Sequence, residues 1–456
     1  MSTSVHFDRG TLEVDLSNSD AHGDLGALWD ARTCSHRVPA YRFGDLAALA
    51  DSTRTHLAGD LRRSWQIRRR DTNALSLRSY QRQALAAWTA FGRRGVVALP
   101  TGAGKTRVAV AALFDTGLPA AILCPTKALA AAWVDELELH LGERVGLIGD
   151  GERRIERVTV LTFESAFRHM DSIGDRFGLL VVDEVHHFGS GARIEALEAC
   201  AAAARLGLTA TAPEPRSEHA ARLERLVGPV VFELAYADLV GTHLAPLSLV
   251  RLHVRLEPEE RLEHDAKARP FAELRRAFLR QYPAADLVTL LRALGKTAEG
   301  QRALRDHARA QELASFPRAK RALVRSLLER HRDDRAIVFT AFAENAYDVA
   351  VDNLVPVIAA ETSARERRDI LARFREGKIR AIASARVLNE GIDVPEARVA
   401  IIVAGTLGAR EHVQRIGRVL RPAPEKEALV YELVTAATSD ARRASARARH
   451  APHASS

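Results

Sequence analysis

Apolar runs the length of single strands alternate, along the middle of the chain, with segments whose pattern is helical. Between residues 75 and 230 these runs lie at 95–99, 120–124, 158–162, 179–182 and 206–209. Strands that are apolar throughout and alternate with helices are typical of a parallel sheet covered by helices on both faces. This part of the chain therefore predicts an α/β lobe.

A second series of the same kind begins near residue 335. Its apolar runs lie at 335–340, 355–358, 379–383, 399–403 and 428–432. The two series together predict an α/β fold with two tandem, doubly wound parallel-sheet lobes, at 71–235 and 236–440. A chain of 456 residues is long enough for two or three domains, each with its own core.

Both ends of the chain differ from these lobes. Residues 1–70 predict a separate, small α+β domain, because short apolar runs such as 11–16 are broken there by Asn, Asp and Gly. Residues 441–456 are rich in Arg, Ala and Ser, and this composition predicts a disordered tail.

The segment 259–332 has a helical pattern and carries nearly the whole charge excess of the chain. It holds 17 Lys and Arg against 10 Asp and Glu, a net charge of +7, where the chain as a whole has +8. A solvated helical connector has such a composition. A basic element that touches nucleic acid has it too, and the composition leaves both readings open.

Composition narrows the class of protein further. No apolar window of about 18 residues predicts a membrane span, and the N-terminus has no basic and then apolar leader. The three cysteines, Cys34, Cys124 and Cys200, are too widely spaced for a zinc or iron–sulfur site. Their number and spacing favour a reducing, cytoplasmic location over a disulfide framework.

The most specific motif is a glycine-rich loop between a predicted strand and a predicted helix. Backbone N–H groups of Thr101, Gly102, Ala103 and Gly104 are expected to cradle the phosphates of a nucleotide at the helix N-terminus. Lys105 would neutralise the phosphates, and the Thr106 hydroxyl would bind Mg²⁺. The strict pattern has Gly at its first position, where this chain has Leu99.

Two acids follow the predicted strand 179–182, at the edge where the loop also lies. Asp183 could hold Mg²⁺ through water, and Glu184 could polarise an attacking water as general base. Two acids after a strand are on their own more often a helix N-cap pair, and only the phosphate loop reverses that reading. His186 is expected to link the nucleotide site to a nucleic-acid site.

Basic residues recur on a predicted helix near the end of the second lobe. Gln414, Arg418 and Arg421 are spaced i, i+4 and i+7 and therefore lie on one face. A solvated basic face has this spacing as well. Turned toward the first lobe, the same face would supply arginines that stabilise charge in the transition state of phosphoryl transfer.

These motifs, in this order, resemble those of superfamily 2 helicases of the DEAD/DEAH-box type, and more narrowly the XPB-type DNA helicases and translocases of bacteria and archaea. The segments are RSYQ (78–81), LPTGAGKT (99–106), PT (125–126), DEVH (183–186), TAT (209–211), NEGIDVP (389–395) and QRIGRVLR (414–421). Weaker N-terminal matches lie at 7–12, 29–30 and 37–43. The resemblance spans about 75–435 and extends to the N-terminal domain.

The resemblance implies two RecA-like lobes, a damage-recognition-like domain at 1–70 and a thumb-like helical insertion at 259–315. It implies ATP and Mg²⁺ as cofactors, single-stranded or forked DNA as partner, and a monomer that works with a separate nuclease. Gln81, assisted by Arg78, would read the adenine, and Asp393 would couple nucleotide to strand. The residues that would hold the nucleic-acid backbone are Pro125, Thr126, Thr162 and Thr340.

One departure bears on mechanism. XPB-type proteins often carry Arg-Glu-Asp just after TAT, whereas this chain retains only Arg216-Ser-Glu218. ATP-driven movement along DNA is thus more firmly implied than strand separation, in a role in DNA repair. An RNA-directed motor, a restriction-type motor and a damage-binding ATP switch that does not move processively remain alternatives, because all share the ATPase residues.

Overall fold

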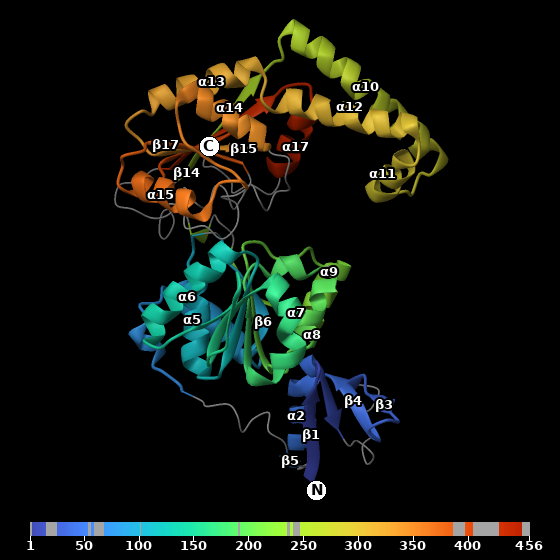
Figure 1. The fold of residues 1–456 in the computed structure, drawn as a ribbon, viewed down its shortest axis with the longest axis vertical. Coiled ribbons are helices and arrows are strands. Elements are labelled where there is room, and N and C mark those ends of the chain that lie inside the picture. The colour runs from blue at the N-terminus through green and yellow to red at the C-terminus, as the bar shows by residue number, and fades with distance from the viewer. Residues whose placement is uncertain are drawn as a thin grey trace. The chain divides into compact units, whose positions relative to one another are not determined.

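The computed structural model describes residues 2–14, 25–52, 56–58, 68–100, 102–189, 192–234, 238–239, 247–385, 397–404 and 428–448. The described residues divide into two compact units, one up to Leu239 and the other from Leu247 on. Figure 1 shows three sheets in these units. Each unit is described separately below.

The N-terminal domain is built on a five-stranded sheet in the order β3-β4-β2-β1-β5. Its neighbouring strands are antiparallel except β1 and β5, which run parallel. The strands are β1 (Ser2–Asp8), β2 (Thr11–Val14), β3 (Leu28–Asp30), β4 (Ser35–Pro39) and β5 (His56–Ala58), with helix α2 at Phe43–Ser52. Ala201 of the first lobe belongs to the same apolar cluster as Val5 and Phe43 of this domain.

The first lobe is an eight-stranded sheet in the order β13-β6-β12-β11-β7-β10-β8-β9. Every neighbouring pair is parallel except β8 with β9. The strands are β6 (Arg94–Ala98), β7 (Ala120–Cys124), β8 (Gly146–Gly149), β9 (Glu152–Arg154), β10 (Val158–Thr162), β11 (Leu179–Val182), β12 (Ala204–Thr209) and β13 (Val230–Glu233). The central strands are buried throughout, as their apolar sequences predict.

Helices connect these strands and cover both faces of the sheet (Figure 1). They are α4 (Ser79–Ala90), α5 (Lys105–Thr116), α6 (Lys127–Leu141), α7 (Phe163–Ile173), α8 (Glu195–Glu198) and α9 (Glu218–Leu226). Thr126, Thr162 and Ser217 cap α6, α7 and α9 by accepting a backbone N–H of the first turn. The chain therefore turns sharply from strand to helix at the ends of β7 and β10.

The second lobe is a six-stranded, wholly parallel sheet in the order β14-β19-β18-β15-β17-β16. Its elements are β14 (Leu247–Val254), α13 (Arg318–Arg330), β15 (Ala336–Thr340), α14 (Ala343–Asn353), β16 (Val357–Ile358), α15 (Ala364–Arg375), β17 (Ala381–Ala385), β18 (Val399–Ile402), β19 (Ala428–Thr435) and α17 (Ser439–Ala448). The prediction of two tandem α/β lobes is confirmed.

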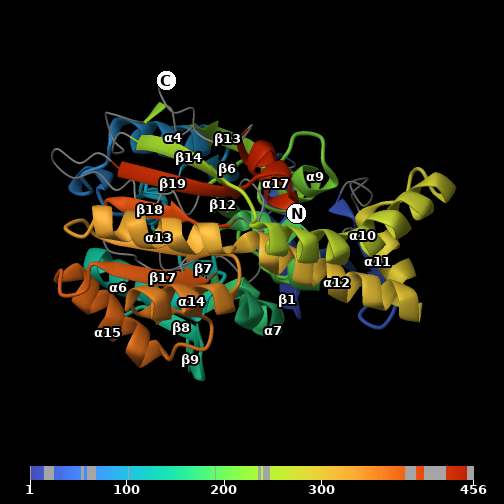
Figure 2. The ribbon, with the colours of Figure 1, turned by 90° about the horizontal axis from the view of Figure 1, so that it is seen from above.

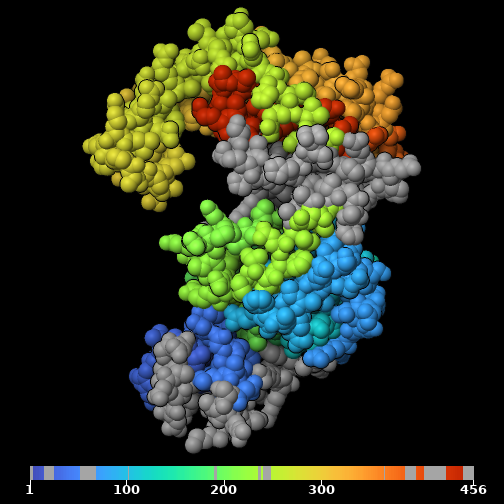
Figure 3. All heavy atoms as spheres, turned by 180° about the vertical axis from the view of Figure 1, so that it is seen from behind, coloured from blue at the N-terminus to red at the C-terminus, as the bar shows by residue number. Residues whose placement is uncertain are grey.

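Between β14 and α13 the chain forms three helices, α10 (Pro258–Gln281), α11 (Leu287–Gly295) and α12 (Ala298–Ser315), here called the helical arm. Figures 1 and 2 show that the arm extends away from the sheet of this lobe, and Figure 3 shows it from behind as a projection in yellow and yellow-green. Lys267 pairs with Asp306 at 2.9 Å, and the ring of Phe271 stacks on that of His307. These contacts hold α10 against α12.

The prediction of a disordered tail from residue 441 is wrong for residues 441–448, which belong to α17. Just before them, the fully buried Asp440 carboxylate accepts hydrogen bonds from Lys320 Nζ at 2.8 Å and from the backbone N–H of Thr435 at 3.0 Å. Ala444 is buried as well. A polar anchor of this kind fixes the helix start despite its polar, Arg-rich sequence.

Among the described residues, no helix has the length and apolar character that a membrane span needs. The three cysteines are free thiols, of which Cys34 is exposed and Cys124 and Cys200 are buried.

Candidate functional site

The residues predicted to carry chemistry in the first lobe follow neighbouring strands of one parallel sheet. The phosphate loop follows β6, Thr209 ends β12 and Asp183 follows β11. Thr126 and Thr162 come at the ends of β7 and β10, the next two strands across the sheet. Because the carboxyl ends of parallel strands meet at one edge, these groups line a single edge of the sheet, where ligands of open α/β folds bind.

The phosphate loop is shaped by two glycines in left-handed conformation, Gly102 with φ of 86° and Gly104 with φ of 77°. A Cβ at Gly104 would lie 2.5 Å from Gln81 Nε2 and would push that amide away from the loop, while the positive φ itself favours glycine. Lys105 and Thr106 begin α5 and are half-buried. Lys105 Nζ donates to the carbonyl oxygen of Leu99 at 3.3 Å.

Side chains of helix α4 hold the backbone of this loop by hydrogen bonds. Gln81 Nε2 and the Tyr80 hydroxyl both donate to the carbonyl oxygen of Ala103, at 2.9 and 2.8 Å. Gln81 Oε1 accepts from the backbone N–H of Arg78, and the Arg78 guanidinium donates to the Tyr80 hydroxyl. Gln81 is buried, and its amide is hydrogen-bonded to the loop backbone. Sequence reasoning missed Tyr80, whose partner lies 23 residues away.

Asp183 lies directly after β11 with its carboxylate almost fully buried. Oδ1 accepts from the backbone N–H of Glu184 at 2.9 Å, and Oδ2 accepts from Trp133 Nε1 at 3.0 Å. Burial raises the pKa of this carboxyl, while the Lys105 ammonium is the largest influence that lowers it. A buried carboxylate of this kind gains from a bound cation.

A polar chain joins the second acid to the next strand. Glu184, which adopts a left-handed φ of 49°, lies with Oε2 at 3.4 Å from His186 Nδ1. His186 Nδ1 is also 3.2 Å from Thr209 Oγ1. The Thr209 hydroxyl donates to the carbonyl oxygen of Thr211, so it accepts a hydrogen bond from Nδ1–H of His186. The conformation after β11 is thus tied to the end of β12.

Oxygen ligands suited to Mg²⁺ are available at this edge in the Asp183 carboxylate and the Thr106 hydroxyl. Mg²⁺ at nucleotide sites takes one or two protein ligands and completes its shell with phosphates and waters. In the part of the chain that the structure describes, no cluster of three or more His, Cys, Asp or Glu side chains could hold a metal alone. The donor set therefore fits a metal that arrives with a nucleotide.

Comparisons with known proteins bear on this geometry. Residues 74–214 match the family model of the res subunit of type III restriction enzymes, and residues 319–423 match the helicase conserved C-terminal domain. The chain is 34% identical over 371 residues to DNA 3'-5' translocase XPB2 of Sulfurisphaera tokodaii, covering 81% of this chain and 83% of that protein. The chain belongs to the XPB family of superfamily 2.

A second XPB-family relative agrees with that assignment, and a solved structure matches the fold. DNA 3'-5' helicase XPB of Mycobacterium tuberculosis is 30% identical over 467 residues, covering 98% of this chain and 77% of that protein. The structure of the Hef helicase domain from Pyrococcus furiosus matches with a TM-score of 0.51 at 17% identity, covering 82% of this chain and 99% of that one. This likeness supports the fold of two RecA-like lobes.

The residues predicted to hold the nucleic-acid backbone in this XPB-family chain differ in exposure. Pro125 and Thr126 are half-buried, and Thr126 caps α6. Thr162 is buried and caps α7. Thr340 is fully buried, and its hydroxyl donates to the carbonyl oxygen of Phe342. The Thr340 side chain is thus covered by protein in this conformation, and its contact with nucleic acid stays a prediction. The N-termini of α6 and α7 present backbone N–H groups suited to phosphate.

Five predicted residues lie outside the described part of the chain. They are Thr101, Asp393, Gln414, Arg418 and Arg421. Their roles stay predictions from the sequence.

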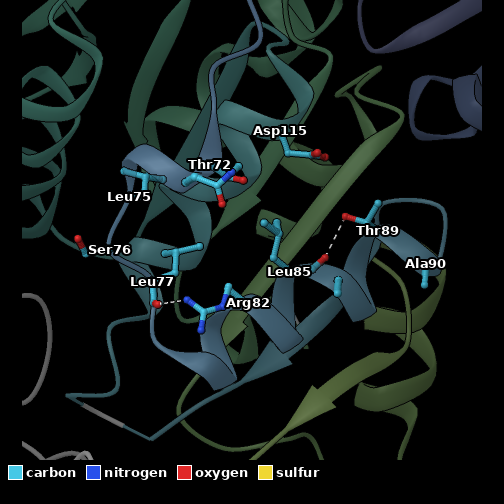
Figure 4. Close-up of a pocket in the computed structure, with 11 residues that line it drawn as sticks. Thr72, Leu75, Ser76, Leu77, Arg82, Leu85, Thr89, Ala90 and Asp115 are labelled. Carbon is cyan, nitrogen blue, oxygen red and sulfur yellow. Dashed lines mark hydrogen bonds between the residues drawn. The ribbon is translucent and has the colours of Figure 1, made fainter.

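A separate cavity of about 620 Å³ lies on the other side of α4 (Figure 4). Leu77 and Leu85 line it together with Arg82, which donates to the carbonyl oxygen of Leu77 at 2.6 Å. Thr89 of α4 and Asp115 of α5 line it as well. None of the residues predicted to bind nucleotide lines this cavity, so it is distinct from the phosphate loop.

Proposed function

We propose that this chain is an ATP-driven motor that moves along or opens DNA. Its membership of the XPB family and the match to both helicase domains support an ATP-dependent DNA helicase or translocase. The observation that carries the proposal is the edge of the first sheet. There the phosphate loop and Asp183 follow β6 and β11, Thr209 ends β12 between them, and the next two strands lead into capped helices.

In this proposal the chain binds and orients ATP in the first lobe. Lys105 contacts the phosphates, while Thr106 and Asp183 hold Mg²⁺, which when bound neutralises charge on the phosphates. Glu184, the residue directly after Asp183, takes a proton from the attacking water as general base. Gln81 and Tyr80 keep the loop backbone in the shape that the phosphates require.

The polar chain from Glu184 through His186 to Thr209 supports a role in relaying the state of the nucleotide. Gln414, Arg418 and Arg421 would reach the γ-phosphate from the second lobe, and Asp393 would couple it to the bound strand. The N-termini of α6 and α7 would grip the backbone of one DNA strand. Hydrolysis would then loosen and renew that grip.

Movement along DNA is proposed ahead of strand separation. The Arg-Glu-Asp motif used for opening is reduced here to 216–218, in the chain between β12 and α9. The N-terminal domain is proposed to recognise damaged DNA, and the helical arm to touch DNA through its basic helices. A monomer that works with a nuclease is the corresponding proposal for its partners.

Displacement assays test this function directly. Purified protein is given ATP with a forked duplex and, separately, with a triplex whose third strand a moving translocase strips off. Displacement of the third strand supports a motor, and displacement of the forked strand adds unwinding. ATP hydrolysis without either displacement would favour a damage-binding switch and contradict the motor. Lys105→Ala is the control, since any displacement it still makes is independent of ATP hydrolysis.

A further inference from the structure

The Asp183 carboxylate is held by a residue from a different element, Trp133 on helix α6. The indole Nε1–H donates to Asp183 Oδ2 at 3.0 Å, and Trp133 is 2% exposed. The other oxygen, Oδ1, accepts the backbone N–H of Glu184. With one N–H on each oxygen, the plane of the carboxylate is fixed, and the remaining lone pairs are left for a ligand.

Another buried indole in the first lobe, that of Trp88, hydrogen-bonds to a backbone carbonyl instead of to an acid. Trp88 is also fully buried, and its Nε1–H donates to the backbone carbonyl oxygen of Arg205 at 2.8 Å. A backbone carbonyl satisfies a buried indole N–H as well as a carboxylate does. Packing alone therefore does not explain why the Trp133 indole donates to the Asp183 carboxylate at the edge of the sheet where the phosphate loop lies. Trp88 is a matched control for experiments on Trp133.

The helix that carries Trp133 begins at the edge of the sheet where nucleic acid is proposed to bind. Thr126 caps α6 with its hydroxyl, which accepts the backbone N–H of Leu129 at 3.2 Å. Trp133 lies seven residues beyond this cap, about 10 Å along the helix axis at 1.5 Å per residue. A hydrogen-bonded helix moves as a unit, so a displacement of its N-terminus reaches the indole and the carboxylate.

We propose that Trp133 is a positioning residue that orients the Asp183 carboxylate for the metal of the bound nucleotide and links that orientation to strand binding at the N-terminus of α6. The proposal rests on the proposed function in two respects, the binding of Mg²⁺ by Asp183 and the binding of a DNA strand at the N-terminus of α6. Residues that hydrogen-bond a metal ligand typically change metal affinity 10- to 100-fold when mutated. DNA bound at α6 would shift the carboxylate toward its metal-binding orientation and so stimulate hydrolysis.

The decisive experiment compares Trp133→Phe with Trp88→Phe. Each variant removes one indole N–H from a buried site and keeps an aromatic ring, and thermal unfolding checks that both fold. Binding of Mn²⁺ together with ADP is measured from the electron paramagnetic resonance signal of free Mn²⁺, and ADP binding without metal is measured by calorimetry. ATP hydrolysis is then followed with and without single-stranded DNA.

We expect Trp133→Phe to weaken Mn²⁺ binding with ADP by about 10-fold, to leave metal-free ADP binding unchanged and to lose DNA stimulation while still binding DNA. Trp88→Phe should match the wild type in all of these. Wild-type Mn²⁺ binding and DNA stimulation in Trp133→Phe would overturn the proposal. If the wild type itself binds no Mn²⁺ with ADP, the proposed metal site at Asp183 is wrong. This result differs from a failure of the Trp133 proposal, in which the wild type binds Mn²⁺ and Trp133→Phe binds it equally well.

A measurement on the unsubstituted Trp133 keeps the proposal testable should Trp133→Phe not fold. The protein is labelled with 5-fluorotryptophan, and its resonances are assigned by elimination with single Phe variants at Trp29, Trp65 and Trp88. Addition of ADP with Mg²⁺ should shift the Trp133 resonance and leave that of Trp88 in place. An unmoved Trp133 resonance under saturating nucleotide would contradict the proposal.

Discussion

The Tyr80 hydroxyl donates a hydrogen bond to the carbonyl oxygen of Ala103 across 2.8 Å, so the helix α4 holds the phosphate loop by its backbone. Gln81 donates to the same oxygen. The loop that is proposed to cradle phosphate is therefore fixed by two side chains from a segment that precedes it in the chain. The family resemblance assigns reading of the adenine base to Gln81. In the structure the Gln81 amide holds the loop backbone, so the two roles can be tested separately.

Tyr80→Phe should raise the KM for ATP and for GTP by the same factor, because it removes a brace and no group that reads a base. Loss of one hydrogen bond is worth about 1 kcal/mol, or about 5-fold. Steady-state kinetics with both nucleotides check this. Tyr431→Phe is the matched control, because it removes a tyrosine hydroxyl that is hydrogen-bonded to His331 in the second lobe. A change in the ratio of ATP to GTP specificity would contradict a purely bracing role.

Glu184→Gln should keep ATP binding and lose about 10²- to 10⁴-fold in kcat, since a general base contributes about that much. The amide keeps the size of the side chain but cannot take a proton from water. Single-turnover hydrolysis and nucleotide binding are measured side by side. A kcat within a factor of two or so of wild type would show that another group activates the water.

Lys320→Met should destabilise the second lobe strongly. Lys320 and Asp440 form an ion pair at 2.8 Å with both side chains at most 1% exposed. Removing one partner of a buried pair costs about 3–5 kcal/mol, because the other charge stays buried. Urea unfolding measures the free energy of unfolding. The control Lys378→Met breaks an exposed pair with Glu376 and should cost under about 1 kcal/mol.

Native protein should present one reactive thiol to a disulfide reagent at pH 8, and three after denaturation in guanidinium chloride. Cys34 is exposed, whereas burial raises the pKa of the Cys124 and Cys200 thiols and keeps them protonated. The unfolded chain ionises these two thiols near the ordinary value of about 8.5. Their contribution to stability is therefore complete below that pH and falls as the pH rises above it. Three rapidly reacting thiols in the native state would contradict the buried positions.

The sequence predicts much of the fold because central parallel strands are apolar throughout. The bounds predicted for β7, β10 and β11 coincide with the structure. The strand β14 (Leu247–Val254) was missed, since it lies at the edge of its sheet and includes Ser248, Arg251 and His253. Edge strands face solvent on part of their surface, so their pattern resembles that of a polar connector.

The residues of the candidate site also differ in whether the sequence can predict them. The phosphate loop and the acids at 183–184 are recognisable because each is a local motif whose spacing follows from its chemistry. Tyr80 and Trp133 are not, because their partners lie 23 and 50 residues away and only the folded sheet brings them together. The sequence does not predict helix α17, because the buried contacts of Asp440 with Lys320 and Thr435 outweigh an Arg-rich composition.

The most direct test of an ATP-driven DNA motor is steady-state ATP hydrolysis by the purified protein, measured alone and with single-stranded DNA, forked DNA or RNA. We expect strong stimulation by DNA, weak stimulation by RNA and no hydrolysis by Lys105→Ala under any condition. Stimulation by RNA alone, or hydrolysis that no nucleic acid changes, would contradict the account.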